Sequence, residues 1–256
     1  MSKRLVLGVT GVMLLLLVLV MIVVLVYDNH LDGQENSAGP NFMSSYSDYG
    51  YDKIDPETIL ASLGRGDTKN FVPLLGEPHS IKELTNITIN WTQADFLKIA
   101  GALGQFVWND PMDPKRWSVF SIGLDGSCLS PFGFQSASIA YFRLEGGTYI
   151  TRLIEMEPAF GWVGWGDGEQ YPQPILHKWK GVDLSGARVS ADDAIRIVGQ
   201  DAISRFQAKD SCGVVMGSPE NNDPENWYLH TFLGSNFVLY VVNLETGHYT
   251  VQKPNQ

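Results

Sequence analysis

The chain has 256 residues and a formal net charge of −10, from 18 basic and 28 acidic side chains. Nucleic acid is not an expected partner, because binding it requires a basic surface that neutralises phosphates. With 44% hydrophobic residues, the composition is that of a folded globular chain and not of a disordered one.

Residues 5–26 contain no charge and are almost wholly aliphatic. As a helix they would span roughly 33 Å, enough for a hydrocarbon core of about 30 Å. Lys3 and Arg4 precede this segment and acidic residues follow it, so the positive-inside rule predicts a cytoplasmic tip at residues 1–4 and an extracytoplasmic remainder. We therefore expect a single-pass protein of the cell membrane, held in the lipid bilayer by residues 5–26. A cleaved secretory signal is the alternative, and it would export the same domain.

Residues 27–55 are rich in Asn, Ser, Gly, Asp and Tyr, which predicts a flexible stalk. The folded part is expected to open at Asp55 and Pro56, an N-cap followed by proline at the first helical position. Two further helices are expected after Thr92 and Ser190, because an aspartate follows each of them at capping-box spacing. Apolar residues recur at helical spacing after both caps.

Strand-like segments follow each of the latter two helices. They are residues 117–122, 138–145 and 148–157 in the first half, and 227–233, 237–244 and 248–251 in the second. Gly146 and Gly147 join two of them in a predicted hairpin. Antiparallel strands after an amphipathic helix favour the α+β class, so we expect two helix-plus-antiparallel-sheet units, residues 56–185 and 186–256. The first unit ends in an aromatic crossover rich in Gly and Pro.

Residues 189–251 resemble the PepSY-type domains of exported bacterial proteins and of propeptides of secreted peptidases. The resemblance rests on residues 190–194 (SADDA), which open the helix, and on residues 238–247 (VLYVVNLETG). Asn243 stands where that family usually has Asp. The resemblance implies a small PepSY-like helix-on-sheet unit that is associated with interaction or peptidase modulation, and it does not imply catalysis.

The sequence contains two cysteines, Cys128 and Cys212. In an oxidising compartment this pair is expected to form a disulfide bond, which would close a loop of about 84 residues and stabilise the fold by a few kcal/mol. Two buried free thiols are the alternative. Neither cysteine lies in a C-x-x-C motif, so a redox or zinc motif has no support.

We found no familiar catalytic, metal-binding or cofactor-binding motif in the sequence. The histidines are scattered, although His230 and His248 lie on adjacent expected strands. Glu155 and Glu157 would share one face of a strand, where they could bind Ca²⁺ or act as a carboxylate pair, but a solvated strand explains them as well. The sequence therefore predicts no metal, no cofactor and no enzyme activity.

An aromatic group with an acidic neighbour is the most suggestive feature of the sequence. It comprises Trp162, Trp165, Asp167, Tyr171 and Trp179. If exposed, these side chains could contact a partner or stack on sugar rings; if buried, they would fill the space between two sheets. The sequence as a whole predicts a membrane-anchored, extracytoplasmic, non-catalytic domain that binds a protein or peptide partner at the cell surface. The alternative is a surface carbohydrate-binding module or hydrolase that uses residues 162–179.

Overall fold

The computed structural model describes eleven segments of the chain. These are residues 45–51, 56–66, 71–73, 91–128, 133–158, 162–173, 178–184, 187–206, 213–217, 224–233 and 236–252. The helices in this part are α2 (Pro56–Gly64), α3 (Gln93–Trp108) and α4 (Ala191–Phe206). The strands are β1 (Ser45–Tyr51), β2 (Phe71–Pro73), β3 (Ser118–Ser127), β4 (Gly133–Glu145), β5 (Thr148–Glu157), β6 (Trp162–Asp167), β7 (Tyr171–Pro172), β8 (Gly213–Gly217), β9 (Asn226–Leu233), β10 (Asn236–Asn243) and β11 (Tyr249–Gln252).

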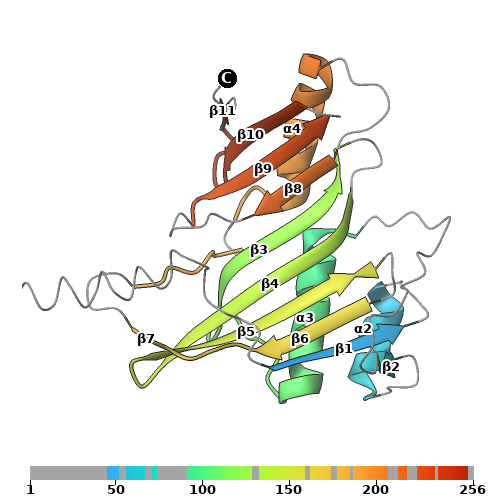
Figure 1. Ribbon diagram of the computed structural model, residues 1–256, viewed down its shortest axis with the longest axis vertical. Helices are drawn as coiled ribbons and strands as arrows, with labels where there is room; N and C mark the ends of the chain where they lie inside the picture. Colours follow the sequence, from blue (N-terminus) through green and yellow to red (C-terminus); the bar gives the residue numbers. More distant parts are fainter. Residues whose placement is uncertain are drawn as a thin grey trace, which may run out of the picture.

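All of these strands belong to one antiparallel sheet (Figure 1). Its order is β11-β10-β9-β8-β3-β4-β5-β6-β1-β2, and β7 pairs with β5 outside this path. The sheet thus joins two runs of consecutive strands, β3 to β6 after α3 and β8 to β11 after α4. Their junction is the pairing of β3 with β8, from Gly123 opposite Gly217 to Ser127 opposite Gly213.

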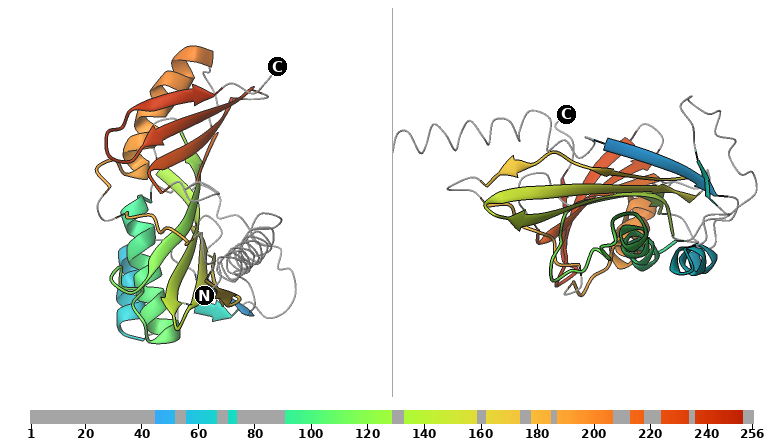
Figure 2. Two further views of the ribbon diagram at one scale, coloured as in Figure 1. Left: turned by 90° about the vertical axis from the view of Figure 1, so that its left-hand side faces the viewer. Right: turned by 90° about the horizontal axis from the view of Figure 1, so that it is seen from below.

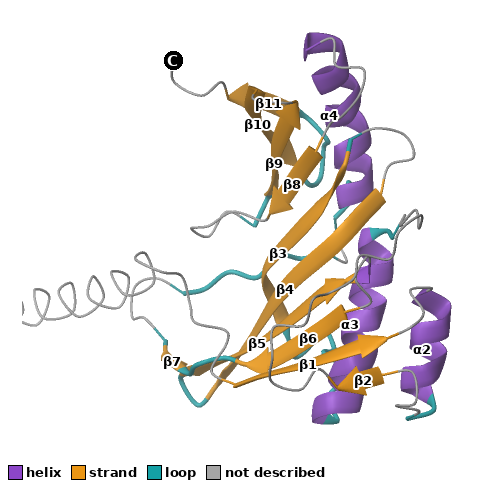
Figure 3. Ribbon diagram, turned by 45° about the vertical axis from the view of Figure 1, so that its right-hand side comes forward, coloured by secondary structure: helices purple, strands orange, loops and turns teal. Residues whose placement is uncertain are grey.

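The expectation of two helix-plus-sheet units with separate sheets is therefore wrong. The first strand after each helix has an edge with unpaired backbone groups, and the two edges satisfy each other by pairing. As a result the described strands on both sides of residue 185 share one sheet. Figures 2 and 3 show that α2, α3 and α4 all lie on the same face of this sheet.

The expected membrane-spanning segment, residues 5–26, lies outside the described residues. Within the segments that the structure does describe, no helix has the length and apolar character needed to cross a bilayer. The fold class that we expected, with an N-terminal transmembrane helix in front of two units, therefore has no support in the structure.

Part of the expected stalk, residues 27–55, is a strand. Ser45–Tyr51 forms β1, which pairs with β6 on one side and with β2 on the other. Tyrosine favours strands, and β1 contains three tyrosines in seven residues. Pairing with β6 also removes an open edge from the sheet, a gain that composition alone does not show.

The main hydrophobic core lies between the sheet and the helices. On α3 the predicted stripe of Phe96, Ile99 and Leu103 is buried, as expected from its helical spacing. These side chains belong to the same cluster as Ile122 of β3 and Tyr240 of β10. The core is therefore continuous across the β3–β8 junction, which explains why the two halves form one body.

Capping boxes start both long helices, as the sequence predicts. Thr92 and Asp95 exchange side-chain and backbone hydrogen bonds at the start of α3. Ser190 and Asp193 do the same at the start of α4. Each carboxylate also lies near the positive end of its helix dipole, which stabilises the first turn.

The two helix starts also cap each other, a contact that the sequence does not reveal. The backbone N–H of Gln93 donates to the Asp192 carboxylate at 3.0 Å, and the backbone N–H of Ala191 donates to Gln93 Oε1 at 2.7 Å. Burial raises the pKa of Asp192, and the hydrogen bond from Gln93 partly offsets that effect. These bonds fix α3 against α4 on the helix side of the sheet junction.

Candidate functional site

The structure divides the predicted aromatic group between the two faces of the sheet. Trp165 is 8% exposed and belongs to the main core under the helices. Trp179 is 7% exposed and lies in a second cluster, with Phe142 and Tyr149. Strand alternation places Phe142 and Tyr149 on the face opposite to the helices, because their neighbours along the strands are in the main core. We call this the opposite face.

Aromatic side chains stack on one another in the second cluster. The rings of Tyr149 and Trp179 are parallel within 4° and their centroids are 4.3 Å apart. The Trp179 backbone N–H also donates to the Tyr149 hydroxyl oxygen at 2.9 Å. Tyr171 is half-buried, 5.5 Å from the Trp179 ring. Trp165 and Trp179 therefore have no exposed ring face on which a sugar could stack.

The other two members of the predicted group have different positions. Asp167 is 53% exposed at its side chain and pairs with Arg152 Nε at 3.3 Å. It also accepts a hydrogen bond from Trp108 Nε1 at 3.4 Å. Trp162 begins β6, but its side chain lies outside the described part of the structure. The predicted site residues are thus not brought together as one binding surface.

A buried aspartate, Asp110, lies among three arginines. The Asp110 side chain is 8% exposed, and its Oδ2 lies 3.1 Å from Arg143, 3.6 Å from Arg116 and 3.7 Å from Arg152. Trp117 Nε1 donates to the same oxygen at 3.1 Å. The cluster joins the loop after α3 to strands β4 and β5.

Tryptophan and arginine alternate beside Asp110. The guanidinium of Arg152 lies 4.5 Å from the Trp108 ring centroid and 4.6 Å from that of Trp117. Arg143 lies 4.6 Å from the same Trp117 ring. Each contact has the geometry of a cation–π interaction, worth about 0.5–2 kcal/mol depending on how far it is desolvated.

Local backbone geometry places Asp110. Asn109 ends α3 in the left-handed conformation with φ of 51°. Gly104 lets the following loop approach the helix, because a Cβ at that position would lie 2.4 Å from Met112 Cγ and 2.6 Å from the Asp110 carbonyl oxygen. The chain therefore turns sharply enough to aim Asp110 at the arginines.

The charges of Asp110 and the three arginines interact with one another inside the fold. Burial alone would raise the pKa of Asp110, but the Trp117 hydrogen bond and the three arginines outweigh it, so the pKa is lowered. Asp110 is then ionised at neutral pH and fixes the end of α3 on the sheet. This cluster was not predicted from the sequence. Its signal was an arginine on the apolar face of each of two strands, Arg143 beside Tyr141 and Arg152 beside Ile154.

A different set of polar residues lies on the opposite face, on β3, β4 and β5. We call it the acidic patch, and its members are Asp125, Ser136, Ser138, Glu155 and Glu157. Their strand neighbours Leu124, Ala137, Ile154 and Met156 are in the main core, so alternation places the patch on the other side of the sheet.

Strand register brings the members of the acidic patch together. Asp125 is opposite Ser136, and Ser138 is opposite Glu155. The Ser136 hydroxyl donates to Asp125 Oδ2 at 3.1 Å, and the Ser138 hydroxyl donates to Glu155 Oε1 at 3.4 Å. The expectation that Glu155 and Glu157 share one strand face fits this arrangement, and Asp125 adds a third carboxylate that the sequence did not associate with them.

The surroundings of Glu157 in the acidic patch oppose its ionisation. Burial, then repulsion from Glu155, then repulsion from Asp125 all raise the pKa of Glu157. Each influence opposes ionisation, so a positive charge placed against this patch would be favoured. Among the described residues no set of three or more metal-type ligands is grouped so as to hold a metal ion.

Cys128 follows the last residue of β3 and is fully buried. It takes part in a disulfide bond. The other cysteine of the sequence, Cys212, lies outside the described residues. Ser127 is paired with Gly213, so Cys128 directly follows the last given pair between β3 and β8. The disulfide thus belongs to the junction between the two halves of the sheet.

Comparison with known proteins places the chain in no family. No family model matches it, so the resemblance of residues 189–251 to PepSY-type domains stays a prediction. No curated protein matches it either. The solved structure of a candidate lipoprotein from Clostridium difficile 630 is 9% identical, with a TM-score of 0.38, and the match covers 67% of this chain and 99% of that one. Similarity at this level does not establish a shared fold.

Proposed function

We propose that this chain is an extracytoplasmic, non-catalytic module that binds a partner protein at the cell surface through the acidic patch. The observation that carries the proposal is the grouping of Asp125, Glu155 and Glu157 on one face of the sheet. Burial, and then the negative charges of Glu155 and Asp125, raise the pKa of Glu157, so ionised Glu157 is held in the patch at a cost. A partner that brings lysine or arginine to this face would relieve that cost.

The surroundings of the patch suit a protein surface better than a small ligand. The patch lies on the strands of a sheet, between serine side chains that supply hydrogen-bonding groups. Contacts of this kind steer association and set specificity, and they are sensitive to salt. Several basic side chains on the surface of a partner protein would reduce the mutual repulsion of the carboxylates.

The compartment is supported by chemistry at the sheet junction. Cys128 is disulfide-bonded, and structural disulfides persist in oxidising compartments outside the cytosol. A location on the outer side of the cell membrane agrees with that chemistry. The carbohydrate-binding alternative depended on exposed tryptophans, and the burial of Trp165 and Trp179 removes its main support.

The test replaces Asp125 by Asn and both Glu155 and Glu157 by Gln in one variant. Wild-type protein and variant are immobilised, and proteins captured from extracytoplasmic and membrane fractions are compared by mass spectrometry. We expect capture of a specific partner to fall on the order of tenfold, as the loss of about 1.4 kcal/mol would produce. The loss should resemble the effect of raising salt on the wild-type protein.

The matched control is Glu57→Gln, which removes an exposed carboxylate from α2, on the face that carries the helices. Thermal unfolding of the triple variant is measured beside capture. At Glu157, burial and then the charges of Glu155 and Asp125 raise the pKa in the folded state. Its ionised form is penalised above that pKa, and the penalty disappears at lower pH. Glu157→Gln should therefore be at least as stable as wild type at neutral pH. Equal capture by wild type, triple variant and control would contradict the proposal.

A further inference from the structure

The outer edge of β11 is a second surface with a defined chemistry. β11 is the last strand at one end of the sheet, and no described strand pairs with its outer edge. On its inner side it pairs with β10, with Val241 opposite Thr250 and Val242 opposite Tyr249. A strand edge offers backbone donors and acceptors at regular spacing, which only another extended backbone can satisfy fully.

Register identifies which backbone groups face outward. The Asn243 backbone N–H donates to the His248 carbonyl at 2.9 Å, so Asn243 and His248 form a hydrogen-bonded pair. Such pairs alternate along an antiparallel ladder, so Thr250 bonds inward to β10. Tyr249 and Val251 consequently direct their N–H and C=O groups away from the sheet.

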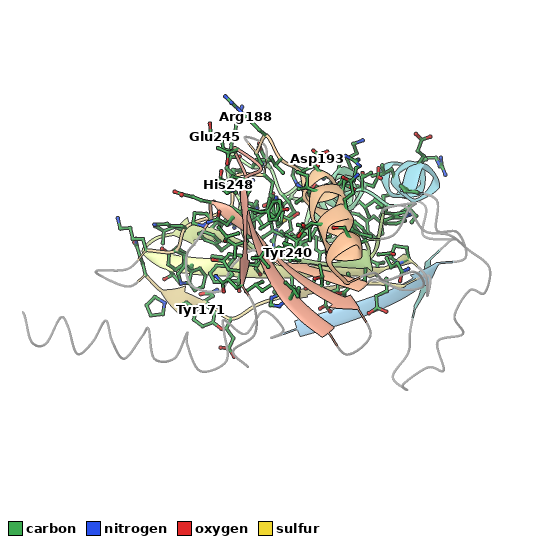
Figure 4. The ribbon with its side chains drawn as sticks, turned by 90° about the horizontal axis from the view of Figure 1, so that it is seen from above. Tyr171, Arg188, Asp193, Tyr240, Glu245 and His248 are labelled. Carbon is green, nitrogen blue, oxygen red and sulfur yellow. The ribbon has the colours of Figure 1, made fainter. Side chains whose placement is uncertain are left out.

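One outward group is occupied by a side chain of the same chain. Nδ1 of His248 lies 3.1 Å from the Tyr249 carbonyl oxygen. Because a carbonyl can only accept, Nδ1 carries the proton in this contact. His248 is exposed, and Figure 4 shows it near Glu245 and Arg188 at the end of the molecule that carries β10 and β11. The imidazole therefore stands where an incoming backbone N–H would bind.

The side chains of β11 alternate in a way that suits an added strand. Tyr249 and Val251 are half-exposed and pack against the main core on the helix side. Ile197 of α4 is 37% exposed, and its Cδ1 would lie 3.8 Å from a Cβ at Gly247, the glycine just before β11. Thr250 is exposed on the other side. An added strand with apolar and polar residues in alternation would cover the first set and leave the second in water.

We propose that the β11 edge accepts an extended segment of a partner protein as a further strand, displacing the His248 imidazole from the Tyr249 carbonyl. This inference rests on the proposed partner-binding function and adds a second contact surface to it. A peptide segment fits better than a second copy of this chain. Two outward-facing residues provide at most a few hydrogen bonds, whereas an obligate homodimer usually buries about 2,000–5,000 Å².

The experiment uses the full chain and a fluorescent peptide in which valine alternates with threonine and lysine. Binding is followed by fluorescence anisotropy, and hydrogen exchange is measured residue by residue. We expect the peptide to bind and to slow exchange at the Tyr249 and Val251 amides. Val251→Pro removes one outward N–H and leaves the inward pairs of β11 intact, and edge strands tolerate proline. It should weaken binding on the order of tenfold.

A second variant should act in the opposite direction. His248→Ala frees the Tyr249 carbonyl and is expected to tighten peptide binding several-fold. Leu144→Ser is the control for non-specific apolar binding, because Leu144 is 48% exposed on β4, away from β11. If Val251→Pro proves unstable, the exchange pattern of the wild-type protein decides the question.

Three results would overturn the inference. They are absence of peptide binding, protection of amides elsewhere than β11, and dimerisation that Val251→Pro abolishes, which would identify a second copy as the occupant. Each of them leaves the acidic patch untouched. Capture that depends on Asp125, Glu155 and Glu157 can therefore succeed while the β11 edge fails, and the reverse also holds.

Discussion

Replacing Asp110 by alanine is expected to lower the free energy of unfolding by about 3–5 kcal/mol, because it leaves largely buried arginines without their carboxylate. The Arg143 and Arg152 side chains are 18% and 12% exposed, so water cannot fully replace the lost partner. Urea unfolding followed by tryptophan fluorescence measures the effect. Arg116→Ala is the matched control: Arg116 is 57% exposed, and its loss should cost less than about 1 kcal/mol.

The same network gives stability a pH dependence of known sign. The pKa of Asp110 is lowered in the folded state, so its contribution is complete above the unfolded pKa of about 3.9. That contribution is lost as the pH falls through the folded pKa. Acid unfolding of the wild type should therefore include a component that Asp110→Ala lacks. Equal stability of the two proteins at neutral pH would contradict the role given to Asp110.

Replacing Cys128 by serine is expected to destabilise the protein by about 4.5 kcal/mol in the chain-entropy model, for a closed loop of about 84 residues. Cys128 is buried, disulfide-bonded and adjacent to the pair of Ser127 with Gly213, so the loss falls on the junction of the two halves of the sheet. Thermal unfolding with and without a reducing agent provides the measurement.

Reduced wild-type protein and Cys128→Ser should unfold at similar temperatures, both below that of the oxidised wild type. Cys212→Ser should match Cys128→Ser if the two cysteines pair with each other, and the sequence contains no other cysteine. A wild-type midpoint that does not change on complete reduction would show that the bond contributes nothing to the junction.

Local features of the sequence predicted local structure well. Thr92 and Ser190 start helices because each side chain finds its aspartate within a single turn. Gly146 and Gly147 form the hairpin turn, with φ of 59° and 81°, values that glycine adopts readily. In each case the interacting groups are only a few residues apart, so their spacing in the sequence is also their spacing in space.

Long-range pairing could not be predicted in the same way. Apolar residues at every second position identify a strand but not the strand with which it pairs. The residues near Gly123 and Gly217 therefore did not predict that β3 pairs with β8. Two separate sheets and one continuous sheet therefore had the same sequence pattern. The strand β1 was missed for a related reason, because Ser45–Tyr51 also gains stability from its pairing with β6, which composition does not show.

In the candidate sites too, local relationships could be predicted from the sequence and long-range ones could not. Glu155 and Glu157 share a strand face by alternation alone, whereas their approach to Asp125 depends on the register of β3, β4 and β5. Tertiary structure likewise decides on which face of the sheet Trp165 and Trp179 lie, since the sequence around them does not distinguish the two faces. Composition therefore identified residues that matter for packing, while the acidic patch could be recognised only from the pairing of the strands in the sheet.

Site-specific photo-cross-linking tests the central claim most directly. A photoreactive amino acid is placed at Ser136, a half-buried position within the acidic patch, and in a parallel protein at Lys98, an exposed position on α3. We predict that the Ser136 position cross-links a partner outside the cytosol, that neutralising Glu155 and Glu157 abolishes this product, and that the Lys98 position does not yield it. A partner that cross-links from Lys98 and not from Ser136 would contradict the assignment of the acidic patch as the binding surface.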